Sequence, residues 1–349
     1  DGRNETAVSI AQGTHDVTVR GFEIREYAGE GAAGIIATGG NTSNVEITDN
    51  YIHNVTQNGI SAYRSDKAVR PHSNYLIERN RIEQTRFGLV VGQADSAVVR
   101  NNHITGAEAL PETTESSYIG IQVAAATGVR ETSDIVVADN TIRGYYSGTG
   151  SSGIAVWGVG TNESNSTVAS VDVFSNDIDA EIQERGINIV AWSQSSNSWG
   201  RVTDVDVVDN DVTTRNANDT IALGGTPGKQ GVHEDVTILA NRLDGGNGTT
   251  KAGFQIYLPG AQRATGITIA ENTIRDTASV GAAVRAEDDG VARSLSFENN
   301  SLSTGDSGIR LAAVDDSKIA NVAIDGNGFT GYDESALITD SSSSATIDG

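Results

Sequence analysis

Cysteine and methionine are both absent from this chain of 349 residues. Without cysteine, the protein has no disulfide bonds, no thiol catalysis and no metal site built on thiolates. No run of about 18 apolar residues occurs, so we predict no membrane-spanning helix. No signal peptide is present either, and together with the missing Met this predicts a mature or trimmed product whose targeting segment, if it had one, has been removed.

Lysine is also scarce, and the charge is strongly one-sided. Acidic residues outnumber basic ones 46 to 24, only four of the basic residues are Lys, and the formal net charge is -22. This balance argues against nucleic acid or an anionic membrane as the main partner, because both require a basic surface. Acid excess with little Lys is typical of proteins from salt-loving organisms, whose self-repulsion is screened by salt. A GC-rich, non-halophilic source would also favour Arg over Lys, so both sources stay open.

Helical periodicity is missing too, and the chain shows instead a repeat with marks 22 to 38 residues apart. The first mark is an Asn two residues before an apolar residue, and it occurs at Asn50, Asn80, Asn102, Asn140, Asn176, Asn210, Asn241, Asn272, Asn300 and Asn327. The second mark begins the next apolar strand, at Gly59, Gly88, Gly120, Gly153, Gly186, Gly253, Gly281 and Gly308, with Thr220 and Ser335 in two repeats. Such a period is typical of solenoids, propellers or arrays.

The segments between the marks are short, rich in β-branched residues and bounded by Asn, Asp and Gly, which predicts strands. If each repeat is one turn of a coil, successive Asn side chains lie about 4.8 Å apart and can hydrogen-bond along an internal ladder. Asn also tolerates the left-handed backbone of a tight corner. In the first coil, residues 1–40, we expect Gly21 at the ladder position and Gly34 as the second mark.

Units such as Asp49-Asn50-Tyr51-Ile52 and Gly186-Ile187-Asn188-Ile189 resemble the right-handed parallel β-helix proteins of the pectate-lyase type. The resemblance covers nearly the whole chain. It implies an all-β fold, a single-stranded right-handed parallel β-helix of about 10 to 11 coils with an internal Asn ladder, forming one domain over residues 1–349. We see no cap at either end, and uncapped ends predict self-association because exposed edges pair with other chains.

The outward positions of the Gly-marked strands form the predicted substrate-binding face. Alternation places the second and fourth residues after each mark in solvent. The face carries Tyr63, Gln122, Trp157, Asn188, Gln255, Tyr257 and Arg285. Its aromatic residues recur every third coil, about 14 Å apart, which suits platforms along an extended polysaccharide. Exposed aromatic residues can also simply be good strand formers that cover a neighbour, so this alternative stays open.

Two loop clusters flank this face. The candidate catalytic residues are Lys67, His72, Lys229 and His233, and Arg64, Arg70 and Trp192 complete the predicted substrate-binding set. The resemblance implies β-elimination for a lyase, in which a cation neutralises a uronate carboxylate, a base removes the C5 proton and an acid protonates the leaving oxygen. Alternatively, these residues only form surface ion pairs with nearby carboxylates, each of which contributes about 0–1 kcal/mol to stability.

We therefore predict a secreted or cell-surface protein that binds an acidic polysaccharide along one face and, as a lyase, cleaves it. The alternative is a non-catalytic fibre, adhesin or tailspike-like scaffold, because the same repeats serve all these classes. The cofactor stays open: calcium belongs to pectate lyases, but no Asp cluster here reproduces their site, and no residue is assigned to a metal. A hydrolase needs two carboxylates in the groove, whereas the outward positions show Gln, Asn and Arg.

Overall fold

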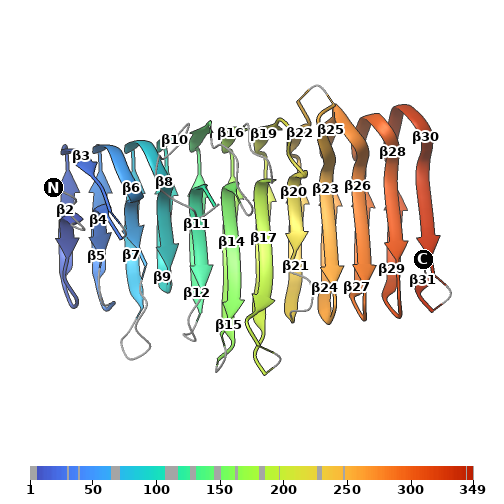
Figure 1. Cartoon of the computed structure of the whole chain (residues 1–349), viewed down its shortest axis with the longest axis horizontal. Helices are drawn as coiled ribbons and strands as arrows, with labels where there is room; N and C mark the ends of the chain where they lie inside the picture. The colour runs from blue at the N-terminus through green and yellow to red at the C-terminus, as the bar shows by residue number, and fades with distance from the viewer. Residues whose placement is uncertain are drawn as a thin grey trace.

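The computed structural model describes residues 6–29, 31–37, 40–63, 71–106, 117–125, 131–144, 151–161, 164–180, 185–195, 197–225, 230–246, 248–342 and 344–348. Over these ranges the chain forms strands and no helix, and hence none long and apolar enough to cross a membrane. The strands stack side by side along one long axis, with the two termini at opposite ends (Figure 1). The fold is a parallel β-solenoid, as the repeat predicted.

One face of the solenoid is a 12-stranded sheet in which every pairing is parallel. In ten coils this strand precedes the corner Asn. The strands are β2 (His15–Arg20), β5 (Ser43–Thr48), β7 (His72–Glu78), β9 (Ala94–Arg100), β12 (Thr132–Ala138), β15 (Ser166–Phe174), β18 (Gly200–Val208), β21 (Gly231–Leu239), β24 (Gln262–Ala270), β27 (Val291–Glu298), β29 (Lys318–Asp325) and β31 (Thr346–Asp348).

The other strands form a 19-stranded sheet that covers two faces. The face after the corner Asn contains β3 (Glu23–Tyr27), β10 (His103–Gly106), β13 (Thr141–Arg143), β16 (Asp177–Ala180), β19 (Asp211–Thr214), β22 (Arg242–Asp244) and β25 (Thr273–Arg275). The next, which we call the glycine face, contains β1 (Thr6–Ile10), β4 (Ala33–Ala37), β11 (Ile119–Ala125), β14 (Ser152–Gly160), β17 (Arg185–Ser193), β20 (Asp219–Gly224), β23 (Thr250–Pro259) and β26 (Thr277–Glu287). Four long strands run over both, namely β6 (Tyr51–Ala62), β8 (Arg81–Gly92), β28 (Ser301–Ala313) and β30 (Gly328–Ser341).

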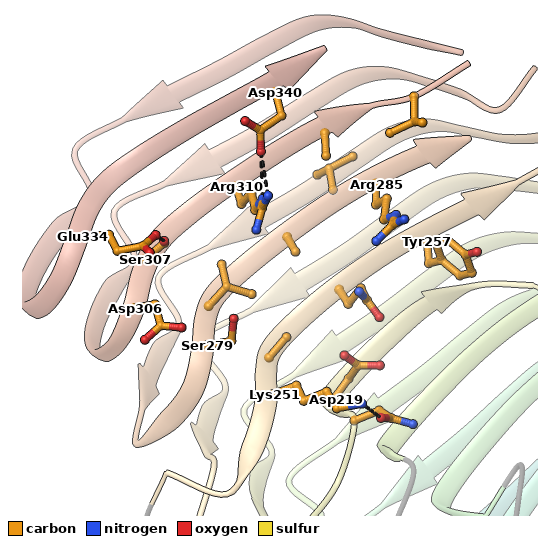
Figure 2. Close-up of a pocket in the computed structure, with 18 of the residues that line it drawn as sticks. Asp219, Lys251, Tyr257, Ser279, Arg285, Asp306, Ser307, Arg310, Glu334 and Asp340 are labelled. Atoms are coloured by element: carbon orange, nitrogen blue, oxygen red, sulfur yellow. Dashed lines mark hydrogen bonds and ion pairs between the residues drawn. The ribbon is translucent and has the colours of Figure 1, made fainter. Parts of the chain in front are cut away.

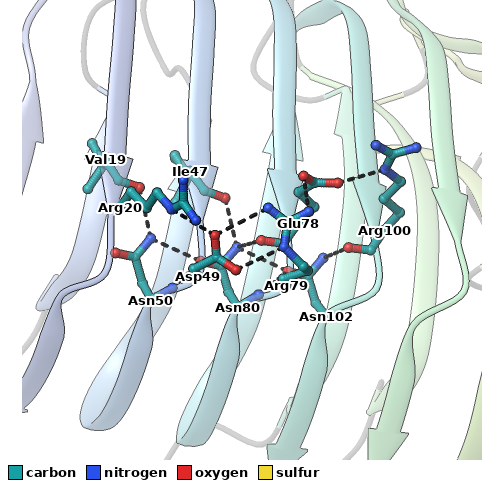
Figure 3. Close-up of polar contacts among 10 residues, drawn as sticks. All are labelled: Val19, Arg20, Ile47, Asp49, Asn50, Glu78, Arg79, Asn80, Arg100 and Asn102. Atoms are coloured by element: carbon teal, nitrogen blue, oxygen red, sulfur yellow. Dashed lines mark hydrogen bonds and ion pairs between the residues drawn. The ribbon is translucent and has the colours of Figure 1, made fainter.

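The predicted Asn ladder is present at all ten positions. The side-chain Nδ2 of each Asn donates to the Oδ1 of the next Asn at 2.8 to 3.0 Å. The backbone N–H of each Asn donates to the same oxygen, as at Asn50 and Asn80. Figure 3 shows the first three members, whose Nδ2 atoms also donate to strand carbonyls. The ladder therefore satisfies backbone groups that the corner would otherwise bury without partners.

The corner differs from the prediction in two details. The left-handed residue is the one before each ladder Asn, such as Asp49 with φ of 55° and Asp139 with φ of 52°. In the first coil the ladder position is occupied by Phe22, whose backbone N–H donates to Oδ1 of Asn50 at 3.0 Å. Gly21, predicted at that position, instead takes the preceding left-handed one with φ of 73°. Gly tolerates that conformation without steric cost, which explains why it stands there.

A row of ion pairs runs along the outside of the same corner (Figure 3). Asp49 lies between Arg20 and Arg79, while Glu78 lies between Arg79 and Arg100. The hydrogen bond from Arg79 is the main cause that lowers the pKa of the Asp49 carboxyl. At Glu78, burial opposes ionisation, but hydrogen bonds from Arg100 and Arg79 outweigh it and lower the pKa of the carboxyl. Both carboxylates thus stay ionised and link successive coils.

The glycine marks have a packing reason. A Cβ on Gly153 would lie 2.7 Å from Cγ2 of Ile178, which follows the ladder Asn of the next coil by two residues. Gly59 and Gly253 face Ile82 and Ile274 in the same way. The two marks of the repeat are therefore complementary, because the apolar residue after each Asn fills the space that a side chain at the Gly position would take.

In the last coil, the predicted position of the Gly mark is one residue too early. The sequence pattern placed Ser335 at the Gly position, but Ser307 pairs with Ser335, so Ala336 is the residue opposite Gly308. A shift of one residue exchanges the inward and outward faces of a strand. Asp340 therefore points outward in this coil and joins the glycine face, where the prediction had placed no carboxylate.

Candidate functional site

A groove with a volume of about 760 Å³ lies on the outer surface of the glycine face, across β17, β20, β23, β26, β28 and β30. Figure 2 shows the residues that line it. Its charged and polar side chains are Arg185, Asn218, Asp219, Lys251, Gln255, Tyr257, Ser279, Arg285, Asp306, Ser307, Arg310, Glu334 and Asp340. Six consecutive coils thus contribute to one site, which runs parallel to the solenoid axis.

Strand register explains how these side chains come together. Gln255 pairs with Ala222 on one side and Ala283 on the other, and Ala283 pairs with Arg310. These residues form one outward row, in which the small alanines leave room between longer side chains. Tyr257 pairs with Arg285 in a second row, which Asp340 also joins through Ala312. The two rows are the second and fourth residues after each Gly mark, which the sequence pattern predicted to face solvent.

At one end of the groove, Asp219 is the centre of a hydrogen-bonded network. Its side chain is only 2% exposed, and its Oδ2 lies 3.4 Å from Nε of Arg185. With the Gln255 amide oriented to satisfy its neighbours, its nitrogen donates to both Asp219 oxygens at 3.0 and 3.1 Å. This arrangement holds the amide rigidly at the groove floor and directs its carbonyl oxygen away from Asp219.

The middle of the groove presents an aromatic ring held by its hydroxyl. The Tyr257 hydroxyl donates to Oε2 of Glu287 at 2.8 Å, and Nε of Arg285 donates to Oε1 of the same carboxylate at 2.5 Å. Burial, followed by the hydrogen bond to Glu287, raises the pKa of Tyr257. The tyrosine therefore stays protonated, with its ring fixed beside the Arg285 guanidinium.

The far end carries carboxylates that the sequence analysis missed. The register shifts between Thr250 and Ala252 and again between Gly305 and Ser307. These irregularities place Lys251 and Asp306 in the lining, together with Glu334 opposite the second one. Bulges redirect side chains, so counting alternate positions from the glycine mark could not place these residues. The prediction that the groove lacks Asp and Glu was wrong.

Asp306 and Glu334 have a distinctive electrostatic setting. Oε2 of Glu334 accepts a hydrogen bond from the Ser307 hydroxyl at 3.3 Å. Neither carboxylate forms an ion pair with any residue that the structure describes, whereas Asp340 accepts from Nε and Nη2 of Arg310 at 3.0 and 2.8 Å. The groove therefore ends in two exposed carboxylates on neighbouring strands.

The predicted binding residues fall into three groups. Gln255, Tyr257 and Arg285 line the groove. A second group, on the glycine face but not in this groove, consists of Tyr63, Gln122, Trp157, Asn188 and Trp192. Within it, Trp157 continues the predicted aromatic row, and the Tyr63 ring lies against Gly92, where a Cβ would come within 2.3 Å of it. The third group, Arg64 and Arg70, lies outside the described residues, as do the predicted catalytic lysines Lys67 and Lys229.

The two predicted catalytic histidines are both buried inside the solenoid. The hydroxyl of Thr42 lies 2.5 Å from Nδ1 of His72, whose ring also packs edge-on against Tyr75. Nε2 of His233 accepts the backbone N–H of Ala191 at 2.9 Å. Neither side chain therefore reaches the outer surface, where a polysaccharide would bind. In the part of the chain that the structure describes, no three His, Asp or Glu side chains gather to hold a metal ion.

His233 makes stability depend on pH. Burial lowers the pKa of His233 from 6.5 to about 4. The unfolded chain binds a proton below about pH 6.5, whereas the folded chain does so only near pH 4, so this stability is present above pH 6.5 and lost as the pH falls. Between pH 7 and 4, wild type should lose about 3 kcal/mol more free energy of unfolding than His233→Gln, measured by urea unfolding.

A matched control for this measurement is His103→Gln, because the side chain of His103 is exposed. We expect this variant to keep the wild-type slope of stability against pH. Equal acid losses in wild type and His233→Gln would show that the buried imidazole does not cause the dependence.

The fold and groove define a parallel β-helix protein, and comparison with known proteins gives the family. Residues 6–212 match the family model of the right-handed beta helix region. This match covers more than half of the chain, so the protein belongs to the right-handed β-helix family, as the repeated Asn and Gly units predicted. No curated protein sequence matches the chain.

Solved structures with a similar fold include proteins of several activities. The surface adhesin PfbA of Streptococcus pneumoniae is 13% identical, with 94% of this chain and 83% of that chain covered and a TM-score of 0.51. The A-module of the mannuronan C-5 epimerase AlgE4 of Azotobacter vinelandii is 13% identical, with 98% and 79% covered and a TM-score of 0.46. An exopolygalacturonase of Thermotoga maritima is 10% identical, with 88% and 71% covered and a TM-score of 0.41. At these identities the likeness concerns the fold alone.

Proposed function

We propose that the protein binds a polysaccharide chain in the groove of the glycine face, with the chain lying parallel to the solenoid axis. The observation that carries this proposal is the lining itself, which joins a fixed aromatic ring to planar polar groups held in hydrogen-bonded networks. Rigid polar groups of this kind match sugar hydroxyls, and an aromatic ring offers an apolar surface to a sugar ring. Six coils in a row suit an extended ligand.

The charges of the groove favour a polysaccharide of low charge over the uronate polymer that the sequence analysis predicted. Arg185, Arg285 and Arg310 are each paired with a carboxylate. At the other end, Asp306 and Glu334 would repel a chain with an acid on every sugar. A hydroxyl-rich chain avoids this repulsion and can accept hydrogen bonds from the arginines. We also propose that the protein is located outside the cell or on its surface, where polysaccharides occur.

Glycoside hydrolysis is the second candidate function, because the groove holds two unpaired carboxylates. Hydrolases place an acid and a base or nucleophile about 5–9.5 Å apart on either side of the scissile bond. Asp306 and Glu334 lie on adjacent strands, whose backbones are about 4.8 Å apart, so side chains that diverge can reach this range. In that reaction one carboxyl group would protonate the leaving oxygen while the other activates water or attacks the sugar. The rival remains a non-catalytic adhesin or fibre that uses the groove only for binding.

The test is affinity electrophoresis and calorimetry against a panel of neutral and uronate polysaccharides. We expect Tyr257→Ala to weaken binding at least about tenfold, equivalent to about 1.4 kcal/mol. The control is Tyr51→Ala, because Tyr51 donates to Glu83 at 2.9 Å beside Arg81, the same arrangement as Tyr257 but away from the groove. Unchanged affinity in Tyr257→Ala, or equal losses in both variants, would contradict the groove assignment.

The same mixtures, assayed for released reducing ends, separate binding from cleavage. A hydrolase would release them in wild type and stop in Asp306→Asn and Glu334→Gln, while both variants still bind. If wild type binds the polysaccharide but releases no reducing ends, the protein is an adhesin or fibre that binds without cleaving, and the hydrolase proposal is wrong.

A further inference from the structure

A second recess lies on the 12-stranded sheet, a different sheet from the one that forms the groove. Its volume is about 420 Å³. It is lined by Trp199, Arg201, Gln230, Gly231, Val232, Glu234, Ala261 and Arg263. The polysaccharide groove shares none of these residues.

Strand register builds the recess around an apolar floor. Val232 on β21 pairs with Arg201 on β18 and with Arg263 on β24. The two guanidinium groups therefore stand on either side of Val232, on strands about 10 Å apart. At one end, Trp199 precedes Gly200, which pairs with Gly231. A Cβ on Gly231 would lie 2.0 Å from the Ala191 carbonyl oxygen of β17, so this strand needs glycine here to pack closely against the interior.

The recess is locally basic in a protein of net charge -22. Its arginines differ from the paired arginines of the groove. Among the described residues, the side chains of Arg263 and the nearby Arg293, which is opposite Thr265, form no ion pair or hydrogen bond. Arg201 donates to Glu234 through Nη2, but its Nε is buried without a hydrogen-bond partner in the same described set. The Arg263 guanidinium thus keeps its donors available near the Trp199 ring, and the Arg201 guanidinium has only Glu234 as an ion-pair partner among the described residues.

We propose that this recess binds an anionic sugar unit, in which a carboxylate or sulfate ester is carried on the ring. The oxyanion would accept charge-assisted hydrogen bonds from the guanidinium groups of Arg263 and Arg201. The apolar face of the sugar would pack over Val232 and against the Trp199 indole. An acidic glycan is therefore assigned to the 12-stranded sheet, while the groove of the glycine face takes a chain of low charge.

The experiment is calorimetric titration of the full chain with three probes: a galacturonate trimer, a neutral galactose trimer, and the galactose trimer carrying sulfate esters. We expect the anionic trimers to bind, more weakly as salt is raised, and the neutral trimer not to bind this recess. Arg263→Gln should lower the affinity for the anionic trimers at least about tenfold. Glu234→Gln should raise it, because the Arg201 guanidinium loses its competing carboxylate. The tighter of the two anionic probes identifies the oxyanion.

The matched control is Arg242→Gln, because Arg242 is also a surface arginine but pairs with Asp211 on another face. Wild-type affinity in Arg263→Gln would overturn the proposal, as would equal losses in Arg242→Gln. A loss of anionic-trimer binding in Tyr257→Ala would place the acidic sugar in the groove and overturn it too. Since Arg263 is exposed, its replacement should not disturb folding, which a thermal melt checks.

Discussion

Asn176→Leu is expected to lower the free energy of unfolding by about 3–5 kcal/mol, because each orphaned buried polar group costs about 1–3 kcal/mol. The Asn176 amide donates to the carbonyl of Val137 at 2.9 Å and to Oδ1 of Asn210 at 2.9 Å. Its own oxygen accepts from the backbone and side chain of Asn140 at 3.1 and 3.0 Å. Leu has a similar size but none of these groups, so two neighbouring coils lose partners that water cannot replace.

The control for this prediction is Asn327→Leu at the last rung of the ladder. Asn327 accepts from Asn300 and donates to the Phe297 carbonyl at 2.7 Å, but its bonds are only part-buried. We expect a smaller loss there, because water can reach the released groups. Urea unfolding followed by circular dichroism measures both variants. Losses of similar size at the two positions would show that buried hydrogen bonds are not what the ladder contributes.

Gly153→Ala is expected to cost about 1–3 kcal/mol of stability, although Ala is normally the better residue in regular structure. The added Cβ would lie 2.7 Å from Cγ2 of Ile178 and 2.8 Å from the carbonyl oxygen of Gly186. The neighbouring coil must therefore move. Gly328→Ala is the control, because the nearest atom there is 4.0 Å away, and we expect a change of at most about 0.5 kcal/mol.

A double-mutant cycle tests the reason for this cost. Ile178→Ala alone should lose about 2–5 kcal/mol, because it leaves a cavity in the core. Combined with Gly153→Ala, it should lose less than the sum of the two, since the new methyl group occupies part of that cavity. Additive losses would mean that the backbone contact with Gly186, and not the Ile178 side chain, requires glycine at this position.

Much of the fold follows from the repeat because a parallel solenoid aligns equivalent residues. A ladder Asn must recur once per coil if its amide is to bond to the next one, and a Gly must recur where the next coil inserts an apolar side chain. These constraints are local in sequence within each coil. Strand class, ladder and outward face could therefore be predicted before the structure was known, and this placed Gln255, Tyr257 and Arg285 on the face that carries the groove.

Side-chain positions were mispredicted in the coils where the number of residues between the expected marks is irregular. Phe22 and Ala336 replace the expected marks, so the sequence pattern was assigned one residue out of phase in those coils. The strand irregularities near Lys251 and Asp306 redirect side chains that a strict alternation would place elsewhere. Composition could not reveal that His233 is buried either, because its hydrogen-bond partner Ala191 is 42 residues away in the sequence.

The sequence by itself determined the class of this protein: a stacked coil with an Asn corner, an apolar interior and a polar outer face. Only the tertiary structure decided which residues line its groove and its recess. The groove joins Asp219 to Asp340, and the basic recess joins Trp199 to Arg263, across several coils in each case. The physical reason is that loop lengths and bulges set which residue of one coil lies beside which residue of the next, and a binding site depends on that neighbour rather than on the repeat.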